Sequence, residues 1–275
     1  MLPSITIGPL PTYYLAMLLG IIAGWLLFLA DDLSDCSGSK LLRAFLSTIS
    51  YIIIVAFCIQ GANYFHYLFD NIPDRVRSTL TLWDILLTPP FRTTKVLYGA
   101  IFFYPLGVLL AGFFRQNMCW RVTLNQKCFA LFSILGFVRL GCFLNGCCYG
   151  IRSDLFGVCF PMGSSASLEH FRRGYTHGFV VPPSLPVIPT QLISSVFLFG
   201  LAIYAWRNFR KNRSSSTYAT AVLNYAVFRF LIEFIRDDLD RAYWWIFSTS
   251  QWISLFIFVC FALLATFKKK AARQE

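Results

Sequence analysis

The chain is poor in charge. Only 13% of its 275 residues are Asp, Glu, Lys or Arg, whereas 57% are hydrophobic and 18% are aromatic. Soluble globular domains average about 25% charged and about 45–50% apolar residues, so this balance excludes a soluble enzyme. It also excludes a disordered protein, because disordered chains are rich in charge and contain few aromatic residues.

Long apolar runs are abundant instead. A helix that crosses a bilayer needs about 20 predominantly apolar residues, and its backbone must satisfy its own hydrogen bonds. The runs here are continuous rather than alternating, which favours helices over a barrel. Seven segments qualify: about 11–30, 45–65, 96–114, 128–149, 190–206, 217–235 and 249–267. We therefore predict an all-α integral membrane protein with seven transmembrane helices. No basic segment precedes the first run, which argues against a removable signal peptide. Without internal repeats or low-complexity tracts, we expect one domain over residues 1–275.

The net charge of +11 comes mainly from basic residues between the apolar runs. They are denser in 31–44, 115–127, 207–216 and 268–275 than in 66–95, 150–189 and 236–248. The denser side is cytoplasmic by the positive-inside rule, so we predict an outer N-terminus and a cytoplasmic C-terminus. This distribution explains the charge without a nucleic-acid partner, and we expect none.

Two arginines, Arg139 and Arg229, lie inside predicted spans. A charge there costs from about 2.5 to more than 10 kcal/mol, so it normally faces a cavity or a partner. Glu233 is the only acidic residue within a predicted span, and its spacing places it on one helical face with Arg229 and Arg236. One interpretation is a structural Arg229–Glu233 ion pair, with Arg236 reaching the outer surface. The other is an anion site, because guanidinium groups in excess match a phosphate, which in a membrane usually belongs to a phospholipid headgroup.

Several motifs surround these residues in a fixed order. They are Ile7-Gly8-Pro9 followed by Tyr13 and Tyr14, the run VRLGCFLNGCCYG from Val138 to Gly150, Pro189-Thr190-Gln191-Leu192, the run FRFLIEFIR from Phe228 to Arg236, and Gln251 with Ser254. The two runs resemble the G-R-[IL]-G-N-F-[IL]-N-G-E and F-R-x-x-x-E-F-x-R elements of the bacterial prolipoprotein diacylglyceryl transferase family. The other motifs are similar to further elements of that family.

The resemblance implies a multi-pass protein of the bacterial inner membrane. In that family the diacylglyceryl group of phosphatidylglycerol is transferred to the lipobox cysteine thiol of a prolipoprotein, and glycerol phosphate is released. Carried over by position, Arg139 becomes the lipid-phosphate ligand, Arg229 the second essential cation, and Glu233 the residue that orients it. Asn145 and Gly150 would shape the turn, while Gln191 and Arg236 would line the substrate site. No cofactor and no metal are implied.

This chain also departs from the family pattern. The His-Gly-Gly element, whose His has been proposed as the base, corresponds to Leu97-Tyr98-Gly99. Cys142 and Cys147 stand at the positions of the signature's first Asn and its Glu, and Ile188, Ile193 and Ser194 replace the His, Tyr and Glu of H-P-[ST]-Q-L-Y-E. Residues that handle phosphate are thus kept, whereas most that handle protons are lost. A non-catalytic or differently specific phospholipid-binding paralogue is therefore the alternative function.

The general base is not identified by the sequence. His66, His170 and His177 fall in or beside the predicted outer loops, where we expect solvated side chains. One of them would replace the missing base if its loop folded back over the cavity. The loops 66–95 and 150–189 are long, and the second is rich in proline, so we expect irregular lid or docking segments.

Nine cysteines raise the question of metal or redox chemistry, and three of them, Cys142, Cys147 and Cys148, cluster in sequence. Zinc sites usually take four ligands arranged in C-x2-C pairs, and that pattern is absent. Three readings stay open. The cysteines pack as small side chains, Cys147 or Cys148 forms a disulfide with Cys142 or Cys159, or a catalytic thiol serves a membrane thiol oxidoreductase.

Overall fold

The computed structural model describes residues 6–7, 10–34, 39–69, 97–114, 119–213, 216–238 and 243–271. Its long helices are α1 (Thr12–Ser34), α2 (Lys40–Phe69), α5 (Leu97–Phe114), α6 (Trp120–Asn145), α8 (Thr190–Asn212), α9 (Thr217–Ile232) and α10 (Thr249–Ala271). Shorter elements are α7 (Ser165–Arg172), the 3-10 helix η1 (Glu233–Ile235) and the strands β1 (Thr6–Ile7), β2 (Leu10–Pro11), β3 (Tyr243–Trp244) and β4 (Phe247–Ser248). The predicted all-α class is confirmed, with one long helix at each of the seven predicted spans. Six are long and apolar enough to cross a membrane, and α10 contains a shorter apolar stretch, Thr249–Leu264.

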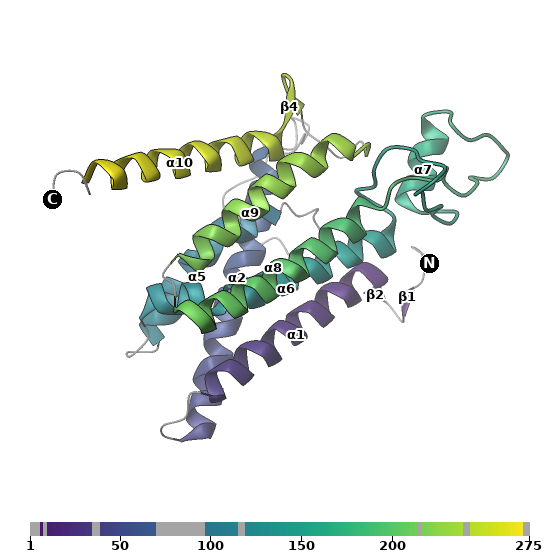
Figure 1. The fold of residues 1–275 in the computed structure, drawn as a ribbon. Coiled ribbons are helices and arrows are strands. Elements are labelled where there is room, and N and C mark those ends of the chain that lie inside the picture. Colours follow the sequence, from purple (N-terminus) through teal and green to yellow (C-terminus); the bar gives the residue numbers. More distant parts are fainter. Residues whose placement is uncertain are drawn as a thin grey trace.

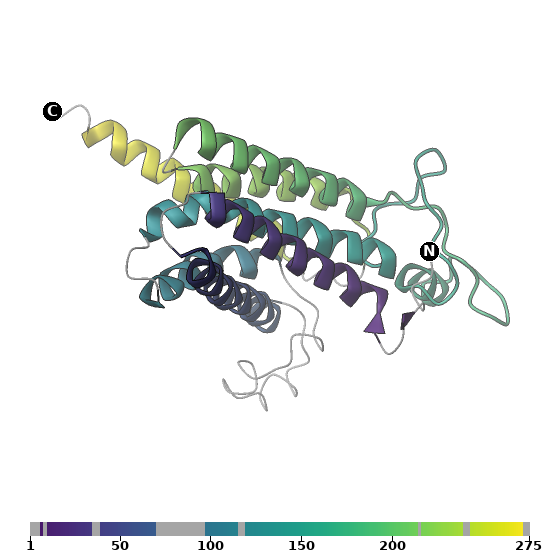
Figure 2. The same ribbon diagram turned by 90° about the horizontal axis from the view of Figure 1, so that it is seen from below.

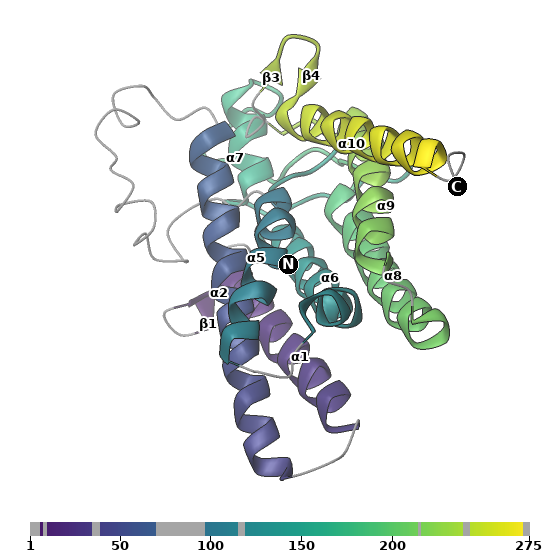
Figure 3. The same ribbon diagram turned by 90° about the vertical axis from the view of Figure 1, so that its left-hand side faces the viewer.

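Helix α6 forms the centre of the bundle. It packs along α1 on one side and α8 on the other, and 72% of its apolar window is buried inside the protein. Helix α2 packs along α5 (Figure 3), and α9 contacts the N-terminal part of α10 (Figure 1). In Figure 1, α10 diverges from the other helices toward its C-terminal end. The central position of α6 places Arg139 in the interior.

Close contact between α2 and α5 depends on two glycines. A Cβ atom on Gly99 would lie 2.1 Å from the carbonyl oxygen of Gly61, a distance that no side chain tolerates. Small residues let membrane helices approach closely enough for backbone contact. The neighbouring Tyr98 hydroxyl lies 2.6 Å from the Ser254 hydroxyl of α10, and its ring makes an edge contact with Tyr225 of α9. The Leu97-Tyr98-Gly99 segment therefore joins α5 to three other helices.

Helix α10 begins with a capping box. The Gln251 side-chain oxygen accepts a hydrogen bond from the Ser248 backbone N–H at 2.9 Å, and the Ser248 hydroxyl accepts one from the Gln251 N–H at 3.3 Å. This reciprocal pair satisfies donors that a helix start leaves free. Gln251, singled out in the sequence, thus has a structural role here.

The helices extend past the apolar runs, which corrects the loop boundaries 31–44 and 115–127. Asp31 and Asp32 lie in α1 and Lys127 lies in α6, so Glu233, which begins η1, is not the only acidic residue within a candidate membrane span. The Lys127 ammonium is 2.7 Å from an Asp31 oxygen and 2.8 Å from an Asp32 oxygen, and it donates a hydrogen bond to the Phe28 carbonyl. A hydropathy pattern ends where charged residues begin. The helices continue through Asp31, Asp32 and Lys127 because these buried charges pair with one another.

The segment 150–189, which we call the cap, consists mostly of turns and irregular backbone, as expected. It contains α7, whose first turn is capped by the Ser164 hydroxyl. Phe160, Ala166 and Val187 of the cap form a small apolar core with Phe143 and Tyr149. The cap covers the ends of α6 and α8 where the described N-terminal strands also lie (Figure 2). Its lid function stays a prediction. Most of the other predicted lid, 66–95, lies outside the described residues.

Replacing Lys127 with Met should destabilise the protein strongly. The change leaves the carboxylates of Asp31 and Asp32 buried without their ammonium partner, a situation that typically costs about 3–5 kcal/mol. Thermal unfolding of the purified protein in detergent measures the effect. Lys211→Met, at an exposed position near the end of α8, is the matched control and should unfold close to the wild-type temperature. Equal unfolding temperatures for the two variants would contradict a stabilising role for the cluster.

Candidate functional site

The site is built around the C-terminal end of α6. Gly146 adopts a left-handed conformation with φ 69°, and its N–H bonds to the Phe143 carbonyl. The Cys147 N–H bonds to the Cys142 carbonyl at 3.2 Å. These two bonds form a Schellman motif, which ends the helix and folds the chain back over its last turn. The predicted span 128–149 therefore stops at Asn145, and Cys147 returns beside Cys142.

Arg139 lies one turn before Cys142 on α6, and only 9% of its surface is exposed. Its Nε atom is buried, with no hydrogen-bond partner among the described residues. Its charge interacts with the charges of Arg229 and Arg236, so the three guanidinium groups share one region. The Tyr225 hydroxyl, also in this region, is likewise buried without a partner in the described chain. Unsatisfied buried donors of this kind need an explanation, and a bound anion is one.

Glu233 holds two of these arginines. Its Oε2 atom is 2.6 Å from Nη1 of Arg229 and 3.4 Å from Nη1 of Arg236. Arg229 also donates a hydrogen bond from Nη2 to the Ser250 hydroxyl of α10 at 2.9 Å. Arg229, Glu233 and Arg236 are brought together as predicted, but not on one helical face, because α9 ends at Ile232, Glu233 begins η1 and Arg236 has an extended backbone. The predicted Arg229–Glu233 ion pair is also present.

Arg236 does not reach the outer surface as one interpretation of the sequence expected. It is 8% exposed, and Asp238 accepts two hydrogen bonds from it, at 2.9 Å from Nε and 2.6 Å from Nη2. Asp238 was missed because it lies beyond the predicted span in a segment assigned to an outer loop. Its position two residues after Arg236 is the signal that was available. Among the described residues, three guanidinium groups thus face two carboxylates, which leaves one positive charge in excess.

Gly150 and the start of α8 fix the turn after α6. A Cβ atom on Gly150 would lie 2.8 Å from the Ile235 carbonyl oxygen, so only glycine lets the chain pair with Arg236 there. Gln191 is 1% exposed, and its Nε2 atom donates to the Cys147 carbonyl at 2.6 Å. The Thr190 hydroxyl donates to the Cys148 carbonyl at the same distance. Asn145 makes one long contact, 3.5 Å from Nδ2 to the Ser165 hydroxyl of the cap. These contacts bring the Pro189-Thr190-Gln191 motif to the turn.

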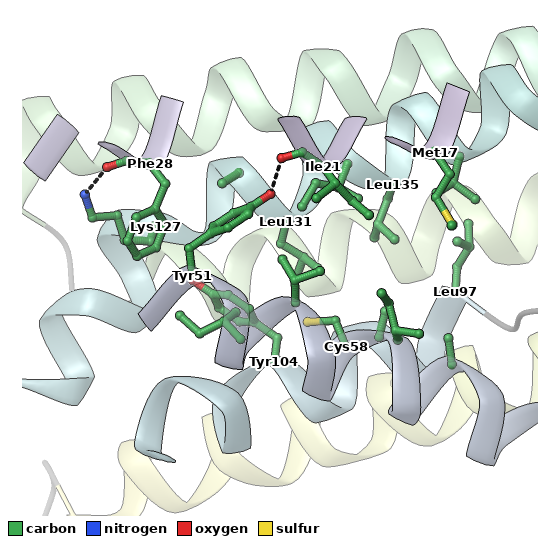
Figure 4. Close-up of a pocket in the computed structure, with 18 residues that line it drawn as sticks. Met17, Ile21, Phe28, Tyr51, Cys58, Leu97, Tyr104, Lys127, Leu131 and Leu135 are labelled. Atoms are coloured by element: carbon green, nitrogen blue, oxygen red, sulfur yellow. Dashed lines mark hydrogen bonds between the residues drawn. The ribbon is translucent and has the colours of Figure 1, made fainter. Parts of the chain in front are cut away.

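An apolar cavity lies between α1, α2, α5 and α6 (Figure 4). It extends from Met17 and Leu97 at one end to Phe28 and Lys127 at the other. Leu135 of α6 lines it, and Leu135 is one turn before Arg139 on the same helical face. Leu97, at the position of the family's His, is therefore part of an apolar wall. The arginine cluster lies toward the same end of α6 as the Met17 and Leu97 end of the cavity.

This combination defines a class: a multi-pass helical membrane protein with a buried, electropositive polar site beside an apolar cavity. The sequence profile described as prolipoprotein diacylglyceryl transferase matches residues 3–267. The chain belongs to this family, a family of transferases.

Individual relatives agree with the family assignment. The chain is 32% identical over 205 residues to phosphatidylglycerol–prolipoprotein diacylglyceryl transferase 2 of Clostridium perfringens, covering 71% of this chain and 73% of that protein. It is 33% identical over 167 residues to the transferase of Clostridium tetani, covering 60% of each protein. It is also 26% identical over 235 residues to the transferase of Geobacter sulfurreducens, covering 82% of this chain and 77% of that one.

The histidines do not supply an obvious base. His170 is 3% exposed, not solvated as expected, and its Nδ1 atom accepts a hydrogen bond from the Leu185 N–H at 3.1 Å. Its ring contacts Tyr149 and Tyr175. His177 is exposed as predicted, and the side chain of His66 lies outside the described residues. His170 therefore has a structural role inside the cap.

The cap should loosen as the pH falls. Burial, assisted by the nearby Arg173 charge, lowers the pKa of His170 below its ordinary value, although Asp237 partly opposes this. A base with a lowered folded-state pKa contributes stability that is complete above its unfolded pKa of about 6.5 and is lost below it. The hydrogen-exchange protection factor of the Leu185 amide should therefore be smaller at about pH 5.5 than at about pH 7.5.

Two variants isolate the effect of His170. Glutamine in His170→Gln can accept the Leu185 hydrogen bond but does not titrate, so most of the pH dependence should disappear. His177→Gln, at an exposed position, should keep it. An unchanged pH dependence in His170→Gln would assign the effect to other groups.

Proposed function

We propose that this protein transfers the diacylglyceryl group of phosphatidylglycerol to the lipobox cysteine thiol of a prolipoprotein and releases glycerol phosphate. Family membership supports this reaction class. The single structural observation that carries the proposal is the Arg139 guanidinium, which is buried beside two other arginines and whose Nε atom has no partner among the described residues. Such a group offers a planar fork to a phosphate.

The proposed chemistry is displacement of a phosphate ester by a thiolate. Negative charge builds on the departing phosphate, and guanidinium groups fixed in advance stabilise it without reorganisation. Arg139 is the proposed phosphate ligand. Arg229 is the second cation, held in place by Glu233 and Ser250. Arg236 completes the positive wall of the substrate site, and Asp238 fixes its orientation. Asn145, Gly150 and Gln191 act through the turn that positions this wall.

The apolar cavity is the proposed place for an acyl chain of the lipid. Its lining is apolar apart from Lys127 and two tyrosines, which lie at or near the Phe28 end. The opposite end, at Met17 and Leu97, approaches the helical turn that carries Arg139. A phospholipid has the same polarity pattern, with an anionic head and apolar chains. The match supports a lipid substrate over a soluble phosphate ester.

The proposed orientation places the cap and Arg139 on the outer side of the bacterial cytoplasmic membrane. The N-terminal part of α6, which carries Lys127, and the C-terminal end of α8, which carries Arg207 and Arg210, lie opposite the cap (Figure 1). The positive-inside rule assigns that end to the cytoplasm. A secreted prolipoprotein would then reach the site from the outer leaflet.

A non-catalytic phospholipid-binding paralogue is the second candidate, because Leu97 forms an apolar wall where the family has a His. Purified protein incubated with phosphatidylglycerol vesicles and a synthetic lipobox peptide separates the two. A diacylglyceryl mass increase on the peptide cysteine supports the transferase. Lipid binding without the mass increase supports the paralogue.

Arg139→Gln should reduce the transfer rate by about 10²–10³-fold, the usual effect of removing one fixed donor from a developing charge. Arg139→Lys keeps the charge but loses the fork, so its rate should lie between those of Gln and wild type. Arg152→Gln is the control, because Arg152 pairs with Asp154 and its side chain is 61% exposed. Transfer by Arg139→Gln at the wild-type rate would rule out the proposed role.

Ala100→Phe should narrow the cavity where α5 lines it. Transfer from long-chain phosphatidylglycerol should then fall more than transfer from a short-chain analogue, because a short chain does not need the deep part of the cavity. Leu109→Phe adds an aromatic ring at an exposed position of the same helix and serves as the control. The readout is the ratio of the two peptide-modification rates. An unchanged ratio in Ala100→Phe would place the acyl chain elsewhere.

A further inference from the structure

Three thiols meet at the end of α6. The Sγ atoms of Cys142, Cys147 and Cys148 all lie within 4.8 Å of one another. The Schellman motif contributes to this arrangement, because it places Cys147, the second residue after the helix, beside Cys142 in the last helical turn. Sequence spacing did not predict this, since the three cysteines do not form C-x2-C pairs.

The turn has an energetically unfavourable backbone conformation at Cys148. Cys148 has a φ of 61°, which a side chain with a Cβ atom rarely adopts. The carbonyls of Cys147 and Cys148 are fixed by Gln191 and Thr190 of α8. Strained positions of this kind persist where the surroundings enforce them, and they concentrate at functional sites.

Neither simple alternative accounts for all three sulfurs. The three thiols are free, so no disulfide joins any two of them, and any such pair would leave a third thiol over. Close packing of small side chains does not require three sulfurs in mutual reach beside two arginines. The charges of Arg139 and Arg236 act on Cys148, so the three sulfurs lie in the same electropositive region as the proposed phosphate site. The carbonyl end of a helix also favours a cation.

We propose that Cys142, Cys147 and Cys148 bind one zinc ion as thiolates and leave its fourth position open for the thiol of the protein substrate. This inference rests on the proposed transferase function. Catalytic zinc sites have three protein ligands and an open position. Tetrahedral zinc with sulfur ligands at about 2.3 Å needs sulfur–sulfur separations of about 3.8 Å, and the three Sγ atoms here lie within 4.8 Å of one another.

Zinc would activate the substrate thiol as the nucleophile, a step for which the described histidines supply no obvious base. Binding to zinc displaces the proton of the substrate thiol, which passes to water at the outer face. The sulfur electron pair then forms the bond to the glyceryl carbon. The bond between that carbon and the phosphate oxygen breaks, and the oxygen keeps its electron pair as glycerol phosphate leaves. The product is a thioether, and no electron donor or acceptor is needed.

Metal content tests the site directly. Protein purified after exposure to zinc chloride and gel filtration should carry about one zinc per chain by mass spectrometry. Cys142→Ser and Cys148→Ser should each lower this at least about tenfold, since soft zinc sites depend on thiolate ligands. Cys159→Ser, at an exposed thiol of the cap, is the matched control and should keep the zinc. Cys147→His supplies another zinc ligand and should keep it too, which packing alone does not predict.

X-ray absorption at the zinc edge tests the open position. The fitted sulfur count should rise from three to four when the lipobox peptide is added. The same peptide with Ser in place of Cys should leave it at three. Arg139→Gln should retain zinc and the fourth sulfur while transfer falls, because it acts on the lipid phosphate.

The outcomes separate the two proposals. Transfer by protein without zinc overturns the metal site and leaves the transferase function standing. Zinc bound with a sulfur count that stays at three overturns the thiol activation. Zinc with the fourth sulfur but no transfer from any phospholipid supports the site and overturns the proposed function. Variants that lose zinc are compared with wild type by thermal unfolding, and loss of zinc in a folded variant supports the site.

Discussion

The structure depends on one constraint: a guanidinium group in a membrane interior must be paired or must bind something. Glu233 meets this requirement for Arg229 and in part for Arg236, and Asp238 completes it for Arg236. Arg139 is the exception, because its Nε atom has no partner in the described part of the chain. Three elements hold these arginines and their partners in place: the turn after α6, the start of α8 and the start of α10.

The protein contains a second group of buried charges for comparison. At the opposite end of α6, Lys127 is enclosed by Asp31, Asp32 and the Phe28 carbonyl, and Arg210 adds a contact to Asp31. That group is fully paired, as expected of an ionic cluster that stabilises a fold. The arginine site has positive charge in excess, as expected of a cluster that binds an anion. One helix therefore carries a paired ionic cluster at one end and, at the other, the cluster that we propose binds the lipid phosphate.

The turn after α6 links the separate parts of the site. It ends the central helix, brings three sulfurs together, and leads through Gly150 to the backbone of Arg236. Gln191 and Thr190 bind its carbonyls from α8. The lipid phosphate, the acyl chain and the substrate thiol would thus be positioned by a few residues of one turn and one helix.

The sequence by itself determined the helical membrane class, the positions of the seven long helices and the grouping of Arg229, Glu233 and Arg236. These follow from local periodicity and from the cost of charge in hydrocarbon, which act along the chain. Tertiary structure alone decided the pairing of Lys127 with α1, the burial of Arg236 against Asp238, the structural role of His170 and the meeting of Cys142, Cys147 and Cys148. Each depends on contacts between segments or on a chain reversal at Gly146, and hydropathy carries no information about which distant side chains satisfy a buried charge.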